Sequence, residues 1–325
     1  MCSARAMHLH RLLPVVAAAA IASGCTGVLG ATEDFMGGPF KAAGLPAMKG
    51  QVATCTGPRE KTFALEAREE AVDLGMGITL AAWTYNGALP GPVLEACEGD
   101  TVTIVMTNHA EAFHGLDSHA FRSDTMHFGP VEPGKAMQIG KTVDTPGVFM
   151  YHCAVGPSTD YHVKSGLAGA MIVYPRNRLL RRARELVVVE TAVYGERDAS
   201  GEIPGTDPEL ARKNEPSIMM FNGRLSHEPL TVEPGDLVRA YIVNVGPGTS
   251  AIHVMGTILD TVTDGASVMR DVQTYGVPAG SGAIVEFRIP ESGMYGLVDH
   301  DRLAYLPYGM VIPFVTAGHD QNGTK

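Results

Sequence analysis

The sequence predicts an all-β protein with two Greek-key β-sandwiches in tandem. Its 325 residues are enough for two domains with separate cores. Glycine (38 residues) and proline (21 residues) are abundant, and long amphipathic helical patterns are scarce. From Thr62 onward the chain consists of short alternating segments separated by turn signals. This combination is typical of sandwiches and barrels rather than of helical bundles.

An internal repeat indicates that the two sandwiches are copies of one pattern. Residues 85–87 (Tyr-Asn-Gly) return as 221–223 (Phe-Asn-Gly). At the same offset, residues 98–100 (Glu-Gly-Asp) return as 234–236 (Pro-Gly-Asp). Self-similarity at one offset is the sequence signature of a duplicated structural unit.

The repeat also defines the expected domains. We expect the first sandwich at residues 61–175 and the second at 185–318, with the basic stretch Arg176–Arg184 between them. Residues 26–50 are rich in Gly, Ala and Pro and show no periodicity. The segment 25–60 is therefore expected to be a flexible tether.

The N-terminus has the pattern of an export signal. Arg5 and Arg11 precede an apolar run, Leu12–Ala22, which is too short to span a bilayer as a permanent helix. The sequence Ala-Ser-Gly-Cys ending at Cys25 resembles the lipobox of bacterial lipoproteins. We expect residues 1–24 to be a lipoprotein signal peptide and Cys25 to carry a lipid anchor, which places the protein in the periplasm or at the outer membrane. An ordinary secretory signal with an incidental cysteine is the alternative.

The net charge limits the macromolecules that the protein can bind, and the cysteine content leaves the state of Cys55 and Cys97 open. The net charge of −10 argues against nucleic acid and is compatible with a basic redox partner. An oxidising compartment permits a disulfide between Cys55 and Cys97, but two buried free thiols are an equal alternative at this stage.

Residues 152–167, HCAVGPSTDYHVKSGL, carry the strongest indication of chemistry. His152 and Cys153 are adjacent, and His162 follows in the same segment. One thiolate and imidazoles in trigonal array are the ligands of an electron-transfer copper. Neighbouring side chains on a strand point to opposite faces, so Cys153 can face the interior while His152 faces outward. If both bind copper, they bind two coppers joined by a few covalent bonds.

A second segment, HGLDSH, also carries two potential ligands that would point to opposite faces of an extended chain. His114 and His119 are separated by an odd number of positions, so an extended chain directs them to opposite faces. One can join Cys153 inside, and the other can join His152 outside. An isolated histidine is more often a surface or satisfied core residue, but this shared parity favours two metal sites.

These motifs, the segment SAIHVMG around His253 and the sequence LVDH ending at His300 resemble the two-domain copper nitrite reductases, especially their lipid-anchored outer-membrane branch. The resemblance covers nearly all of the chain after the signal peptide. It implies a cupredoxin fold for each sandwich, a type 1 and a type 2 copper per chain, and one-electron reduction of nitrite to nitric oxide. It also implies a homotrimer and a small electron-donor protein, either a c-type cytochrome or a cupredoxin.

The resemblance further implies a role for each site residue. The ligands implied for the type 1 copper are His114, Cys153 and His162. Those implied for the type 2 copper are His119, His152 and, from a neighbouring subunit, His300. Asp117 and His253 match the catalytic pair of the family, which would hydrogen-bond the substrate oxygen and supply protons.

Some positions depart from the family pattern. Leu167 stands where the family has the axial methionine of the type 1 copper, so we expect a three-coordinate site with a raised potential. Met171 is the nearest alternative sulfur but has the pattern of a core residue. Met255 replaces an isoleucine that walls the substrate pocket. His127 is either a surface-loop residue or a pocket residue. Three further histidines are expected to be structural or exposed: His109, His227 and His319.

The repeat and the motifs also limit the alternatives. The second copy is aligned with Asp299-His300 opposite His152-Cys153, so it lacks the thiolate and one type 1 copper per chain is expected. A laccase-like multicopper oxidase needs several His-x-His pairs, and the single such pair, at residues 8–10, lies in the signal. A non-catalytic copper electron-transfer lipoprotein is the third possibility. Leu167 is compatible with it, and the presence of the catalytic pair argues against it.

Overall fold

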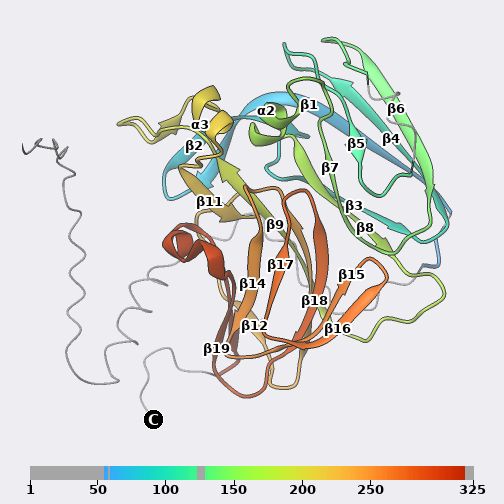
Figure 1. Cartoon of the computed structure of the whole chain (residues 1–325), viewed down its shortest axis with the longest axis vertical. Coiled ribbons are helices and arrows are strands. Elements are labelled where there is room, and N and C mark those ends of the chain that lie inside the picture. Colours follow the sequence, from blue (N-terminus) through green and yellow to red (C-terminus); the bar gives the residue numbers. More distant parts are fainter. Residues whose placement is uncertain (1–54, 58, 123–128, 319–325) are drawn as a thin grey trace, which may run out of the picture. The chain divides into compact units, whose positions relative to one another are not determined.

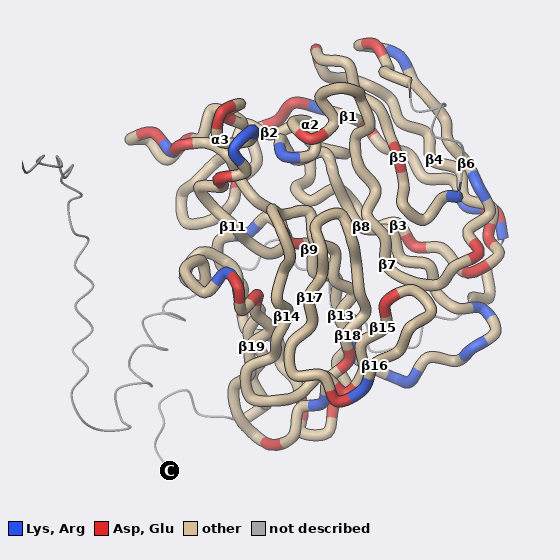
Figure 2. Tube along the Cα trace, in the orientation of Figure 1, with Lys and Arg blue, Asp and Glu red and all other residues tan. Residues whose placement is uncertain are grey.

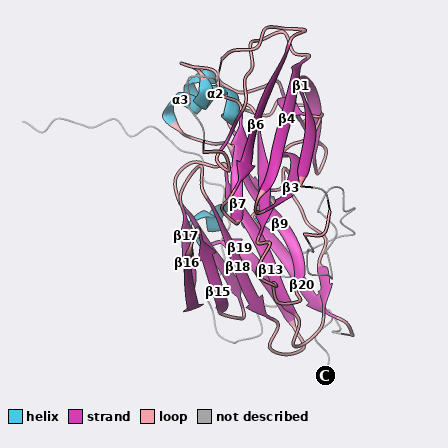
Figure 3. Ribbon diagram, turned by 90° about the vertical axis from the view of Figure 1, so that its right-hand side faces the viewer, coloured by secondary structure: helices cyan, strands magenta, loops and turns pink. Residues whose placement is uncertain are grey.

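Two pairs of β-sheets, one pair in each half of the chain, make up the computed structural model, which describes residues 55–57, 59–122 and 129–318. The strands of the two halves form separate groups in Figure 1, and strands greatly outnumber helices in Figure 3. The predicted all-β fold with tandem sandwiches is confirmed. The predictions for the signal peptide, Cys25, His127 and His319 lie outside the described residues.

The first sandwich pairs a five-stranded sheet, ordered β10-β2-β1-β4-β6, with a four-stranded sheet, ordered β3-β8-β7-β5. Its elements are β1 (Glu60–Gly75), β2 (Ile78–Tyr85), β3 (Gly91–Cys97), β4 (Asp100–Asn108), β5 (Asp117–Ser118), β6 (Ala136–Val143), β7 (Gly147–His152), helix α2 (Thr159–Lys164) and β8 (Ala168–Tyr174). The added edge strand β10 (Glu202–Ile203) comes from the second half of the chain.

The second sandwich pairs sheets ordered β11-β9-β13-β18-β15-β16 and β12-β20-β19-β14-β17. Its elements are β9 (Arg184–Val193), α3 (Pro208–Lys213), β11 (Ile218–Phe221), β12 (Leu230–Val232), β13 (Leu237–Asn244), β14 (Ser250–Met255), β15 (Leu259–Asp264), β16 (Ser267–Val272), β17 (Thr274–Val277), β18 (Gly282–Arg288), β19 (Met294–Asp299), the 3-10 helix η2 (His300–Tyr308) and β20 (Val311–Thr316).

Each sandwich encloses its own core, and a third apolar layer lies between the sandwiches. That layer joins Met150 and Ile172 of the first sandwich to Val189 and Tyr241 of the second. Strands β8 and β13 are buried along their whole length because both of their faces are covered, which explains the apolar sequence of β8 and the mostly apolar sequence of β13. Most charged residues lie toward the periphery in Figure 2.

Hydrogen bonds reproduce the internal repeat. The Asn108 side chain donates to the carbonyls of Ala112 and Val131, both at 2.8 Å. Its counterpart, Asn244, donates in the same way to two loop carbonyls at 2.9 Å and 2.8 Å. Each amide oxygen accepts from the backbone N–H two residues further on, at 3.0 Å and 2.8 Å. In each half, one buried asparagine side chain makes the same set of hydrogen bonds to the backbone around it. The two halves therefore share one architecture.

Strand register corrects the predicted alignment of the repeat by one residue. Asp117 lies opposite His152, whereas His253, which takes the place of Asp117, lies opposite Val298. Asp299 is therefore the counterpart of Cys153. The Gly115 N–H points at Cys153 Sγ at 3.3 Å, and the equivalent N–H of the second sandwich donates to Asp299 Oδ1 at 2.7 Å. The alignment of Asp299-His300 with His152-Cys153 was therefore wrong by one residue, although the second copy does lack the thiolate.

The open question about the remaining cysteines has a definite answer. Cys55 and Cys97 form a disulfide that ties the start of the described chain to the end of β3. Arg176 Nη1 also donates to the Cys55 carbonyl at 2.8 Å. Cys153 is the free cysteine among the described residues. None of the described helices is long and apolar enough to span a membrane.

Candidate metal centres

The inner cluster consists of His114, Cys153 and His162, all three buried in the first sandwich. Cys153 follows β7, His162 lies on α2, and His114 precedes β5. The two Nδ1 atoms are 3.2 Å apart, and Cys153 Sγ lies 3.4 Å from His162 Nδ1 and 3.8 Å from His114 Nδ1. A point equidistant from the three atoms is about 2 Å from each, which is close to metal–nitrogen and metal–sulfur bond lengths. These three residues could hold a metal ion in a trigonal arrangement of two imidazole nitrogens and one sulfur.

Burial keeps these groups uncharged in the absence of metal. It lowers the pKa of His114 to about 4, with the neighbouring His162 adding to the effect, and it lowers the pKa of His162. It raises the pKa of the Cys153 thiol to about 12, against the opposing effect of the Gly115 N–H. The imidazoles are thus available as neutral donors, and metal binding has to displace the thiol proton.

Neighbouring side chains orient the inner imidazoles. Ser158 Oγ lies 3.1 Å from His162 Nε2, so a hydrogen bond on that nitrogen leaves Nδ1 free to face the cluster. The Trp83 ring lies edge-on to both imidazoles, with centroid distances of 4.7 Å to His162 and 5.0 Å to His114. Sequence reasoning missed Trp83, because nothing in its local sequence connects it with residues so far along the chain.

The position of the missing methionine is buried beside the inner cluster. Leu167 is fully buried, and its carbonyl accepts the Cys153 N–H at 3.0 Å. Met171 is also fully buried, and its sulfur accepts from Ser118 Oγ at 3.6 Å, so it packs in the core. Leucine offers a metal only hydrocarbon at this position.

The outer cluster consists of Asp117, His119 and His152. The two Nε2 atoms are 3.1 Å apart, and Asp117 Oδ2 is 3.8 Å from His152 Nε2. His152 Nδ1 donates to the Cys153 carbonyl at 2.8 Å, which leaves its Nε2 lone pair directed at His119. Burial lowers the pKa of His152, against the opposing effects of that carbonyl and of Asp117. A neutral imidazole with a fixed lone pair beside a second imidazole fits a metal ion.

Two predicted site residues lie together in the second sandwich. The rings of His253, on β14, and His300, at the start of η2, are in edge contact with centroids 5.8 Å apart. His253 Nδ1 donates to the Gln273 carbonyl at 2.9 Å, a contact that the sequence did not reveal. His300 is exposed and does not join His119 and His152 within one chain. Among the described residues, the outer cluster therefore has two imidazoles, those of His119 and His152.

The remaining described residues of interest have ordinary environments. His227 is buried, its Nε2 lies 3.1 Å from the Gly309 carbonyl, and burial lowers its pKa to about 4. His109 is half-exposed beside the Glu66 carboxylate at 3.9 Å. Met255 is 42% exposed, so its side chain is available at the surface near His253.

The chain is similar to known copper proteins. A family model described as multicopper oxidase matches residues 66–178. The copper-containing nitrite reductase of Neisseria meningitidis is 32% identical over 256 residues, which cover 75% of this chain. The chain spans 66% of the length of that relative.

Solved structures give the same result, and one of them is matched over nearly its whole length. The copper nitrite reductase from Nitrosomonas europaea is 30% identical, with a TM-score of 0.73, and the match covers 82% of this chain and 97% of that one. The copper-containing nitrite reductase from Thermus scotoductus is 30% identical with a TM-score of 0.70, covering 79% and 62% of the two chains. A multicopper oxidase structure at 24% identity shares the fold.

Proposed function

The chain belongs to the family of copper-containing nitrite reductases, and from this we propose that it reduces nitrite to nitric oxide with one electron and two protons. The observation that carries the proposal is the pair of clusters on opposite sides of the His152–Cys153 peptide bond. Bound copper at the two clusters would supply the one-electron chemistry. Alternating strand faces direct the two side chains to separate clusters while keeping them a few bonds apart.

The inner cluster is proposed to hold the type 1 copper through His114, Cys153 and His162. The outer cluster is proposed to hold the type 2 copper through His119, His152 and His300 of a neighbouring subunit in a homotrimer. The inner cluster is buried under Trp83, which excludes water from it. The outer cluster is open to solvent at His119, so a small anion can reach it.

Asp117 and His253 are proposed to manage the two protons. The Asp117 carboxylate is about a quarter exposed (23%) and lies beside the ligand His152, where it can bind a protonated oxygen of the substrate. His253 has its Nδ1 fixed by the Gln273 carbonyl, so its Nε2 is free to accept or donate a proton. The neighbouring subunit that supplies His300 would bring His253 with it, because the two rings are in contact.

The placement of the protein is part of the proposal. We propose that residues 1–24 are a signal peptide, that Cys25 is lipidated, and that 25–60 is a tether to the sandwiches at 61–175 and 185–318. The Cys55–Cys97 disulfide would fasten the end of that tether to the first sandwich. In the periplasm or at the outer membrane, the acidic protein would receive electrons from a small basic c-type cytochrome or cupredoxin.

Anaerobic turnover tests the proposed activity directly. Protein loaded with copper is expected to form one nitric oxide for each electron taken from a reduced donor when nitrite is supplied. A protein that binds two coppers per chain and reduces no nitrite would contradict the activity. A protein that binds a single copper would instead support the non-catalytic electron carrier, with which the leucine at position 167 is compatible.

Leu167→Met is expected to lower the potential of the type 1 centre. A thioether donor stabilises Cu(II) over Cu(I), and a shift of about 59 mV corresponds to a tenfold change in a one-electron equilibrium, so we expect at least that shift. The counterpart of Leu167 in the second sandwich is Met310, which is fully buried, so the fold accommodates methionine there. Redox titration of the coloured centre measures the shift. Leu167→Ile, which adds no donor, should leave the potential in place, and an equal shift in both variants would argue against axial ligation.

A further inference from the structure

The second sandwich has a buried polar cluster at the place where the first has its inner metal ligands. Ser250 takes the place of His114, and Asp299 takes the place of Cys153. Glu190 joins them through a 2.6 Å hydrogen bond between its Oε2 and Ser250 Oγ. All three side chains are fully buried. A buried carboxylate pair is costly to keep, so it calls for an explanation beyond packing.

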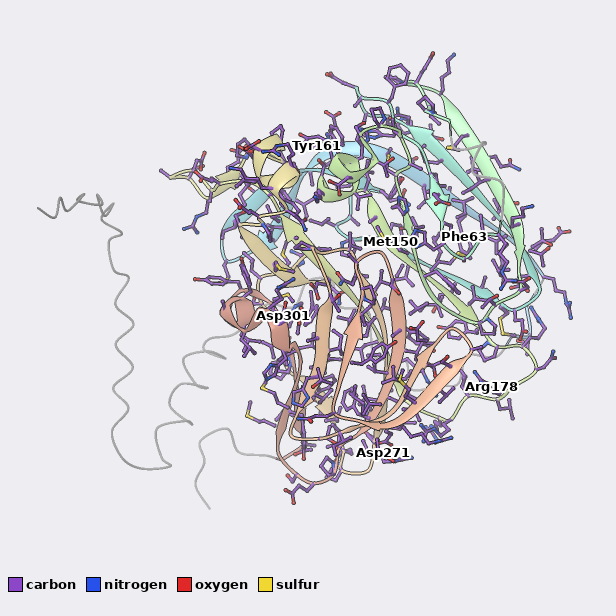
Figure 4. All side chains as sticks on the ribbon, viewed as in Figure 1. Phe63, Met150, Tyr161, Arg178, Asp271 and Asp301 are labelled. Carbon is purple, nitrogen blue, oxygen red and sulfur yellow. A yellow bond between two sulfur atoms is a disulfide. The ribbon has the colours of Figure 1, made fainter. Side chains whose placement is uncertain are left out.

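Asp299 joins the two backbone segments that carry the histidines of the second sandwich. Its Oδ1 accepts the Ala251 N–H at 2.7 Å and the Asp301 N–H at 2.9 Å. Ala251 is two residues before His253 on β14, and Asp301, which Figure 4 labels, directly follows His300 in η2. One carboxylate oxygen therefore fixes the start of η2 against β14.

The surroundings keep this carboxylate in place. Burial and the charge of Asp299 raise the pKa of Glu190 to about 8; burial also raises the pKa of Asp299, against the opposing effects of its two backbone N–H donors and of Arg302. The Arg302 guanidinium provides the compensating positive charge, and its Nη2 donates to the Pro247 carbonyl at 2.6 Å. The cluster thus connects β9, β14 and η2 at a point adjacent to His300.

We propose that Asp299 is a positioning residue for the type 2 centre, holding His300 in a fixed place relative to His253. The inference rests on the proposed function, because it assumes that His300 is a copper ligand. Asp299 does not touch the ligand ring. It accepts hydrogen bonds from the Ala251 and Asp301 N–H groups. Through them it holds the start of η2, which carries His300, against β14. In the first sandwich the equivalent position binds metal itself, whereas here it supports a residue that does.

The test compares Asp299→Ala with Asp299→Asn, His300→Ala and the control Thr191→Val. Asn keeps an acceptor oxygen for both N–H groups, and Ala removes it. Thr191 is the neighbour of Glu190 on β9, and its Oγ1 makes a single buried hydrogen bond, to the Met220 carbonyl at 3.2 Å. Each purified full-length variant is measured for type 1 absorption, for type 2 copper affinity by titration, and for the electron paramagnetic resonance spectrum of the type 2 copper.

We expect Asp299→Ala to keep the type 1 absorption and to bind type 2 copper about 10- to 100-fold more weakly, with a changed resonance spectrum. His300→Ala should lose the type 2 copper, while Asp299→Asn and Thr191→Val should resemble the unaltered protein. If Asp299→Ala does not fold, Asp299→Ser serves in its place, because its single short hydroxyl cannot reach both N–H groups.

Two outcomes would overturn the inference alone. One is a wild-type affinity and spectrum in the Ala or Ser variant, and the other is an equal loss in Thr191→Val, which would indicate general destabilisation. Failure of the proposed function looks different. In that case the unaltered protein binds no type 2 copper, or His300→Ala binds it normally, and the positioning role falls with it.

Discussion

Cys153→Ser is expected to remove the colour and the type 1 copper while the type 2 copper stays bound. The Cys153 sulfur is one corner of the inner triangle, at 3.4 Å and 3.8 Å from the two Nδ1 atoms. A serine hydroxyl remains protonated and cannot replace a thiolate as a ligand, and the intense absorption of such centres comes from the copper–thiolate bond. His119 and His152 lie on the other face of the strand and keep their geometry.

Copper content and visible absorption check this prediction together. The variant should hold about one copper per chain instead of about two, and it should lose turnover with a protein donor. Ser158→Ala is the matched control in the same segment: it removes the Oγ hydrogen bonds to His162 Nε2 and to the Val155 carbonyl, keeps all three ligands, and should keep the colour. Persistent colour in Cys153→Ser would refute the assignment of the thiolate ligand.

Strand parity made the two clusters predictable from sequence. His152 and Cys153 are neighbours on an extended segment, and the HGLDSH segment has the same alternation, so the sequence itself separates an inner group from an outer one. The structure brings together the residues of each group, at distances that suit a metal ion. The alternating pattern with frequent turn signals likewise predicted the sandwich architecture.

The supporting contacts were not predictable in the same way. Trp83 packs against His114 and His162, and Gln273 fixes His253, through contacts between segments that are separated in the sequence. Such contacts depend on strand order and register, and a shift of one residue reverses the faces. The same limitation explains why sequence alignment paired His300 with Cys153, when backbone pairing gives that place to Asp299.

The two sandwiches have diverged most where their common architecture places its buried polar site. The first has the sulfur and imidazole cluster of His114, Cys153 and His162, whereas the second has Ser250, Asp299 and Glu190. The asparagine-anchored loops beside each site are unchanged. One copy of the site therefore could have become structural without loss of the fold, because the strands around it are held by backbone pairing and apolar packing.

Asp117→Asn is expected to lower nitrite turnover by about 10²- to 10⁴-fold while both coppers stay bound. The amide has the size of the carboxyl group and keeps an acceptor oxygen, but it cannot take up and release a proton. Asp117 lies 3.8 Å from His152 Nε2, on the strand that faces the outer cluster. The reaction consumes two protons, so a group that holds one beside the substrate acts on the transition state rather than on copper binding.

Steady-state nitric oxide production measures this effect, and copper analysis with visible absorption confirms that the metals are present. Asp144→Asn is the matched control: it makes the same chemical change at an exposed aspartate that contacts Arg122, away from both clusters. Turnover should be unchanged in the control. Unchanged turnover in Asp117→Asn would remove Asp117 from the mechanism and leave His253 as the remaining proton donor. A loss of type 2 copper in Asp117→Asn would instead make Asp117 an orienting partner of His152.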